Sequence, residues 1–344
     1  MRYLFFLCSF LSCSAFASTQ ITGAGSSFIA PVMYQWTASY SQKTHVQVNY
    51  QSMGSGAGIK QVEGSVVDFG ATDMPLKQEE LQKNGLTQFP LVIGGIVIVT
   101  NVVGTRAGEL ILDATTLALI YSGEIKDWND PRIAALNPTL TLPKTRIVVV
   151  YRADGSGTTF NFTSYLQNAA PQVWHAGSGT SVSWPKSILG VGGTGNEGVT
   201  SFVKRVPGAI GYVEYTYAFE NKLNWSRLKN KQNKVVPNIA KDDLANSQKV
   251  KAAFEHSFQA AASHAQWEAS PAMDVLLVNQ PGQETWPLTA ATFAVMHRKS
   301  DGKKDSKALQ KFFHFVYTEG AQQAQGLNYV PISKKTYDII EARW

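Results

Sequence analysis

Short apolar runs that lead through turns rich in Gly, Ser and Thr into helical patterns recur along this sequence, and they restrict the fold most. The apolar run 147–150 predicts a buried strand, and the turn 152–158 joins it to a predicted helix from Thr159. Similar turns at 22–28 and 52–58 each precede a helical pattern. Strands that alternate with helices in this way are typical of an α/β fold with mainly parallel sheets.

Two longer apolar segments indicate how the chain is divided into lobes. Residues 89–99 are almost continuously apolar, which predicts a strand covered on both faces, and residues 286–296 have similar strand character. We interpret both segments as strands that cross between two lobes. Lobe I then comprises 18–100 plus 276–344, and lobe II, 101–275, is inserted between them.

The first residues have the pattern of a secretory signal peptide. Arg2 gives a positive start, residues 3–13 are mostly apolar, and residues 15–17 read Ala-Phe-Ala, a small-x-small cleavage pattern. We therefore expect residues 1–17 to be removed and the mature chain, starting near Ser18, to work outside the cytoplasm. Both cysteines lie in this segment, so disulfides and thiol chemistry are excluded from the mature chain.

Composition and spacing argue against several classes of function. The net charge is +6, and its densest clusters, 229–234 and 298–304, are typical of solvated loops, so we expect no nucleic-acid binding. The six histidines show no metal-ligand spacing, and no Gly-x-Ser-x-Gly motif or carboxylate cluster for a two-metal phosphatase occurs. We therefore expect no bound metal, no cofactor and no catalytic residues.

Three of the turns favour the binding of an anion. The turns at Ser27, at Ser55 and at 156–158 each place hydroxyl and backbone N–H groups at a helix entry, which suits an anion with several equivalent oxygens. Arg152 adds a planar, bidentate donor, and Asp154 can hold its guanidinium in place. An ordinary surface salt bridge is the alternative explanation for this last pair.

Other glycine-rich stretches are less specific. The turn at 23–28 lacks the last glycine of a dinucleotide-binding fingerprint, and 154–158 lacks the Gly-Lys-Ser/Thr ending of a nucleotide-binding loop. The run 190–198 fits another anion-binding loop, but we favour a flexible surface turn there. Each turn alone carries little information, because Gly-Ser turns are common at helix starts.

Asp73 discriminates between possible anions. It ends the predicted strand 66–73, and a carboxylate beside an anion repels it unless a proton lies between them. Phosphate carries such a proton near neutral pH and sulfate does not, so an aspartate in the site accepts phosphate and rejects sulfate. The alternative is that Asp73 caps a helix that begins at Pro75.

Four stretches together resemble the periplasmic phosphate-binding proteins of phosphate-specific ABC transporters. They are residues 22–28, 67–73, 152–158 and 207–215, and the similarity extends along essentially the whole mature sequence. The resemblance implies a two-lobed type II periplasmic-binding-protein fold, in which each lobe has a mostly parallel sheet flanked by helices. Two crossing hinge strands join these lobes, which close around one dehydrated phosphate ion.

The resemblance also implies a set of site residues. The phosphate-binding positions are Ser27, Phe28 (through its backbone N–H), Ser55, Asp73, Arg152, Ser156, Gly157 and Thr158, with Asp154 as the salt-bridge partner of the arginine. Two departures from the family pattern occur. Ser27 stands where relatives often have Thr, and Gly56 stands where relatives often have Ser, which removes one hydroxyl but keeps the backbone N–H.

The function implied is that of a monomeric periplasmic phosphate receptor without enzymatic activity. It would deliver inorganic phosphate to the membrane permease subunits of an ABC transporter, which work with a cytoplasmic ATPase. Three alternatives are a receptor for another tetrahedral oxyanion, a secreted phosphatase on a similar scaffold, and a surface adhesin. Asp73 argues against the first, and turnover of a chromogenic phosphate ester would support the second.

Overall fold

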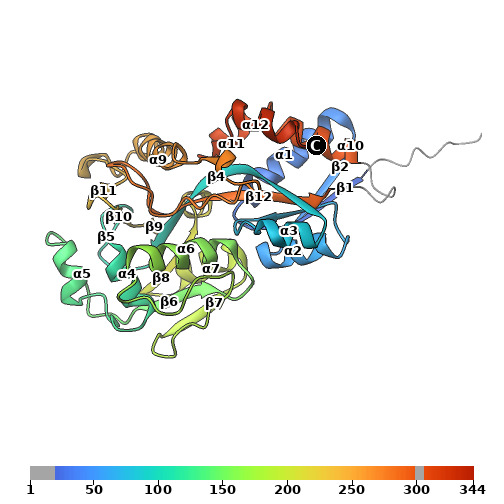
Figure 1. The fold of residues 1–344 in the computed structure, drawn as a ribbon. Helices are drawn as coiled ribbons and strands as arrows, with labels where there is room; N and C mark the ends of the chain where they lie inside the picture. The colour runs from blue at the N-terminus through green and yellow to red at the C-terminus, as the bar shows by residue number, and fades with distance from the viewer. Residues whose placement is uncertain (1–19, 299–305) are drawn as a thin grey trace, which may run out of the picture.

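The computed structural model describes residues 20–298 and 306–344 (Figure 1). The predicted signal peptide and most of the basic cluster 298–304 lie outside these residues. The strands are β1 (Gln20–Gly25), β2 (Gln47–Ser52), β3 (Phe69–Thr72), β4 (Leu86–Thr100), β5 (Ile111–Leu112), β6 (Val148–Arg152), β7 (Gly190–Gly193), β8 (Ala209–Glu214), β9 (Asn224–Trp225), β10 (Arg227–Lys229), β11 (Val235–Val236), β12 (Thr289–His297) and β13 (Val330–Pro331).

Helices follow most of the longer strands. They are α1 (Ala30–Thr44), α2 (Ser55–Glu63), α3 (Gln78–Lys83), α4 (Ala114–Tyr121), α5 (Pro131–Leu136), α6 (Gly157–Ala169), α7 (Gly195–Arg205), α8 (Tyr215–Glu220), α9 (Ser247–Ala262), α10 (Ser306–Tyr317), α11 (Gly320–Gly326) and α12 (Lys334–Glu341). Along the described ranges, none of them has the length and apolar character needed to cross a bilayer.

Ten of the described strands form one sheet. Its main path runs β2-β1-β3-β12-β4-β8-β6-β7, and β13 and β9 both pair with β4. β1 is parallel to β2 and β3, and β6 is parallel to β7 and β8, whereas β12 and β4 run antiparallel to their neighbours. The sheet thus has a parallel group at each end and two antiparallel strands between them.

β4 belongs to both ends of this sheet. Residues 86–95 pair with β12, and residues 96–100 pair with β8. All of its residues except Thr87 are buried, which confirms the strand predicted from the apolar run at 89–99. In Figure 1, β4 and β12 extend between a half that holds β1–β3 with the C-terminal helices and a half that holds α4–α7 with β6–β8.

Two predicted boundaries around Asp73 are wrong. β3 begins at Phe69 rather than at residue 66, and α3 begins after its N-cap Lys77 rather than at Pro75. The segment before α3 is held against β4 because the Leu76 N–H donates to Gln88 Oε1 at 2.9 Å, and Gln88 Nε2 donates to the Leu76 carbonyl at 2.8 Å. Asp73 is therefore not a helix cap.

Candidate anion-binding site

The predicted residues of the first half of the sheet lie where its parallel strands end. Ser27 and Phe28 follow β1, Asp73 follows β3, and Ser55 is the first residue of α2, directly after β2. The carboxyl ends of parallel strands share one sheet edge, so these residues gather although they are far apart in sequence. The Phe28 backbone N–H donates to Ser26 Oγ at 3.0 Å, and its ring is buried in the core.

The predicted residues of the second half lie at the end of β6 and the start of α6. Arg152 ends β6, and Ser156 caps α6 by accepting the Thr159 N–H at 3.0 Å. Gly157 and Thr158 occupy the first turn of the helix. The sequence fixes this local structure, because an N-terminal Ser satisfies a helix N–H and leaves the positive end of the helix dipole directed outward.

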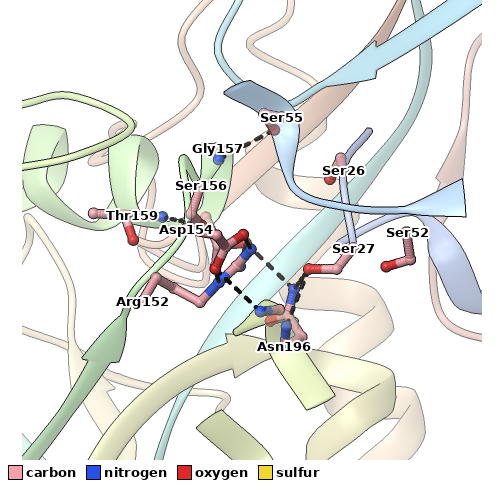
Figure 2. Close-up of polar contacts among 12 residues, drawn as sticks. Ser26, Ser27, Ser52, Ser55, Arg152, Asp154, Ser156, Gly157, Thr159 and Asn196 are labelled. Atoms are coloured by element: carbon pink, nitrogen blue, oxygen red, sulfur yellow. Dashed lines mark hydrogen bonds and ion pairs between the residues drawn. The ribbon is translucent and has the colours of Figure 1, made fainter. Parts of the chain in front are cut away.

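The two groups of residues meet directly (Figure 2). The Gly157 N–H donates to Ser55 Oγ at 3.1 Å, and the Gly56 N–H donates to the Gly155 carbonyl at 2.9 Å. A Cβ atom at position 157 would lie 2.5 Å from Ser55 Oγ and 2.6 Å from the Cβ of Asp73. Only glycine permits this approach, so residue 157 controls how closely α6 can come to α2.

Arg152 and Asp154 form a buried, bidentate ion pair. Arg152 Nε donates to Asp154 Oδ1 at 2.7 Å, and Nη2 donates to Oδ2, while Nη1 lies 3.3 Å from Thr158 Oγ1. The arginine side chain is 1% exposed, which excludes the surface salt bridge weighed above. Burial alone would raise the pKa of Asp154, but the hydrogen bonds and charge of Arg152, with the Gly195 N–H, outweigh burial and lower it.

Asp73 is 2% exposed and accepts hydrogen bonds from the turn after β1, from α2 and from β12. Ser26 Oγ lies 2.6 and 2.7 Å from its two carboxylate oxygens, Thr292 Oγ1 lies 2.6 Å from Oδ1, and Ser55 Oγ lies 3.4 Å from Oδ2. Burial raises the pKa of Asp73 to about 6, although these hydroxyls and the charge of Arg152 oppose the rise. The carboxyl group can therefore act as a hydrogen-bond acceptor at neutral pH.

The glycine-rich run 190–198 is not the surface turn that we favoured. It forms β7 and the start of α7, where Asn196 is fully buried. Asn196 donates to Ser27 Oγ from its backbone N–H at 3.0 Å and from Nδ2 at 2.9 Å, and its Oδ1 accepts the Glu214 N–H at 2.9 Å. Gly193 and Gly198 pack backbone against backbone, because a Cβ atom at position 193 would lie 2.6 Å from the Val199 nitrogen and one at position 198 would lie 3.0 Å from the Gly193 carbonyl carbon. This run joins the two halves of the site.

Sequence reasoning missed four residues of this network. They are Ser26, Asn161, Asn196 and Thr292, of which Asn161 donates from Nδ2 to the Asp73 carbonyl at 2.7 Å. Two of them have a sequence feature that could have indicated a site: Ser26 adjoins a predicted site residue, and Asn196 lies in a glycine-rich turn before a helix. No sequence feature marks Thr292, since threonine is common in strands.

The arrangement is suited to bind an oxyanion. The N-termini of α2, α6 and α7 converge on it, and their dipoles favour negative charge. Arg152 adds a full positive charge, and hydroxyl groups supply donors. Among residues 20–298 and 306–344, no group of three or more His, Cys, Asp or Glu side chains is placed to hold a metal ion.

Fold and site together define a two-lobed substrate-binding protein of type II. The family model described as the PBP superfamily domain matches residues 13–319. The phosphate-binding protein PstS of Haemophilus influenzae is 44% identical over 329 residues, which cover 95% of this chain and 93% of the relative. PstS of Methanocaldococcus jannaschii is 32% identical over 87% of this chain and 79% of that protein. The chain therefore belongs to the PBP superfamily, and within it to the family of phosphate-binding proteins named PstS.

Solved structures agree on the fold. A phosphate-binding protein from Stenotrophomonas maltophilia superposes with a TM-score of 0.69 at 20% identity, covering 95% of this chain and 94% of that one. A phosphate ABC transporter substrate-binding protein from Clostridium perfringens, solved with bound phosphate, gives a TM-score of 0.61 at 18% identity, over 92% of this chain and 100% of that one. These likenesses confirm the predicted two-lobed α/β fold.

Proposed function

We propose that this protein is a phosphate receptor that works outside the cytoplasm, captures inorganic phosphate between its lobes and delivers it to an ABC import permease. It acts as a monomer and catalyses no reaction. Its membership of the PstS family supports this function, as do the converging helix N-termini beside Arg152. The export signal expected at 1–17 supports the location, and the permease subunits with their ATPase are the expected partners.

The observation that carries the proposal is the position of Asp73. It lies beside Ser55, which contacts the first N–H of α6 in the other lobe, so a carboxylate lies among the donors that would hold an anion. A fully ionised oxyanion is repelled there, whereas the O–H of phosphate donates to the carboxylate. Arsenate, which carries a proton at the same pH, is expected to bind as well, and sulfate is not.

The binding residues proposed are those expected from the family resemblance, four from each lobe. Lobe I provides Ser27, Phe28, Ser55 and Asp73, and lobe II provides Arg152, Ser156, Gly157 and Thr158. We propose lobe boundaries at 18–100 plus 276–344 and at 101–275. Because each lobe offers only half of the donors, a phosphate ion gains its full set of contacts only when the lobes close.

Calorimetric titration of the ligand-stripped protein with phosphate, arsenate and sulfate tests this function. We expect micromolar or tighter binding of phosphate, since a handful of charge-assisted hydrogen bonds of about 1.5–3 kcal/mol each is sufficient. Tight sulfate binding, or no binding of phosphate, would contradict the proposal. Turnover of a chromogenic phosphate ester by the pure protein would favour the phosphatase alternative instead.

Replacing Asp73 by Asn tests the residue on which the choice of anion depends. Asparagine keeps the size of the side chain but loses its charge and offers an N–H donor. We expect Asp73→Asn to weaken phosphate binding and to reduce the discrimination against sulfate, both measured by titration at pH 7. If both affinities matched those of the wild type, the role proposed for Asp73 would be wrong.

A further inference from the structure

We infer that Ser26 and Thr292 determine the anion specificity of this site, because they hold the Asp73 carboxylate in the ionised form that accepts hydrogen bonds. Neither residue is among the phosphate-binding positions proposed above. Both act on the anion through Asp73, and the inference rests on the proposed phosphate-binding function. Three observations support it: the orientation of the Ser26 hydroxyl, the placement of Thr292, and the balance of charges around Asp73.

The contacts of Ser26 fix the direction of its proton. Its Oγ accepts the Phe28 N–H at 3.0 Å and lies 2.6 and 2.7 Å from the two oxygens of Asp73. A hydroxyl group has one proton, and an ionised carboxylate can only accept. Ser26 therefore donates to Asp73 and spans both carboxylate oxygens at once. The residue is 1% exposed, so its donor stands in for water that the site excludes.

Thr292 reaches the same carboxylate from β12. Its Oγ1 lies 2.6 Å from Asp73 Oδ1, a distance typical of a hydroxyl that donates to a carboxylate. Thr292 is fully buried within the sheet, where β12 pairs with β3 and β4. Thr292 and Asp73 belong to the same half of the sheet, because β12 pairs with β3. This donor therefore stays beside Asp73 whether or not the lobes are closed.

One charged group also acts on Asp73: the guanidinium of Arg152, from β6, favours the ionised carboxylate. Burial, with the charge of Asp73 as a smaller cause, raises the pKa of Tyr50 from β2, so this hydroxyl is neutral at pH 7. The partners from α2 and α6, Ser55 and Asn161, are uncharged. Burial opposes all of these contributions and still raises the pKa of Asp73 to about 6.

The pKa of Asp73 therefore lies only about one unit below neutral pH, so that a small further rise would protonate the carboxylate. Loss of one short hydroxyl donor would raise this pKa further by about one unit, because a hydrogen bond to a charged group contributes that much to its ionisation, and much of Asp73 would then be protonated at pH 7. A protonated Asp73 becomes a donor and no longer repels a fully ionised oxyanion. The chemistry that rejects sulfate therefore depends on Ser26 and Thr292 as well as on Asp73 itself.

The test compares Thr292→Val and Ser26→Ala with the wild type by calorimetry of ligand-stripped protein, using phosphate and sulfate from pH 5 to 8. We expect the pH at which sulfate binding appears to move up by about one unit, and the phosphate-to-sulfate affinity ratio at pH 7 to fall at least about tenfold. Thr292→Ser keeps the hydroxyl and should restore the wild-type pH profile. Thr289→Val is the matched control, since Thr289 is buried on the same strand and donates to the Trp286 carbonyl at 3.0 Å.

The outcomes separate the inference from the proposed function. Should both anions weaken in the same proportion with no change in the pH profile for sulfate, the two hydroxyls only pack the site, and the inference is wrong. A wild-type protein that binds no phosphate would reject the proposed function, and the inference with it. Because Thr292→Val is nearly isosteric, it tests the inference even if Ser26→Ala does not fold.

Discussion

At the scale of single residues, buried carboxyl groups are the most informative feature of this protein. Glu214, at the end of β8, is 1% exposed and accepts the Thr216 N–H at 2.9 Å. Burial raises its pKa to about 8, and the hydrogen bonds from Thr216 and Tyr329 only partly oppose this effect. Glu214 is therefore mostly protonated at neutral pH, whereas Asp73 is mostly ionised, although both are buried.

Glu214 should make the stability of the protein depend on pH. In the unfolded chain a glutamate ionises near pH 4.5, and in the native protein Glu214 ionises near pH 8. Between these values the native state holds a proton that the unfolded state releases, so the free energy of unfolding falls as pH rises, by up to about 1.4 kcal/mol per unit. Glu214→Gln should flatten this decrease between pH 6.5 and 8 in urea denaturation.

The lower limit of that pH range is chosen because Asp73 contributes in the same direction only below about pH 6. Glu79→Gln, at an exposed position on α3 that is not among the groups acting on Glu214, provides the control, and its stability should follow the wild-type pH profile. A Glu214→Gln variant with an unchanged decrease would show that Glu214 titrates in the native protein as it does in the unfolded chain.

At the scale of elements, the site is built from helix starts brought together by short contacts. Ser55, Gly157 and Asn196 each lie in the first turn of α2, α6 and α7, and each takes part in a hydrogen bond between the lobes. Backbone N–H groups at helix starts have no partner within the helix, so they are available to a ligand or to the other lobe. The small residues Ser55 and Gly157 allow the starts of α2 and α6 to come into direct contact.

Gly157→Ala should prevent this approach. The added methyl group would lie 2.6 Å from the Cβ of Asp73, so the lobes cannot take the arrangement seen here. We expect phosphate affinity, measured by calorimetry, to fall at least about tenfold, while the thermal stability of the ligand-free protein changes little. Gly326→Ala, near the end of α11 with open space around the added atom, is the control. Wild-type affinity in Gly157→Ala would mean that binding does not need this contact.

At the scale of the whole molecule, β4 connects the two halves of the sheet, and the residues proposed to bind phosphate meet where these halves contact each other. The only strand that pairs with both β12 and β8 among the described residues is β4. Hydrogen bonds such as that from Asn196 to Ser27 hold the halves together on the side of the site. A ligand that adds contacts to both lobes should therefore stabilise the closed arrangement.

Phosphate should make the molecule both more compact and more stable. At a free concentration of 100 times Kd, binding to the native state alone adds about 2.7 kcal/mol to the free energy of unfolding. Small-angle scattering should show a smaller radius of gyration with phosphate, and thermal unfolding should shift upward, while sulfate has neither effect. Compaction without a gain in stability, or the reverse, would contradict closure driven by the ligand.

The sequence by itself determined the α/β class, the course of β4 and the chemical type of the site. These follow from local physics: apolar runs must be buried, and Gly/Ser turns before helices expose N–H groups. Only the tertiary structure decided which distant groups meet. The shortest hydrogen bonds to Asp73 come from β12 and from the turn after β1, and Asn196 contacts Ser27 from a run that looked like a surface turn. Such contacts depend on strand order and on the approach of the lobes, which no local pattern encodes.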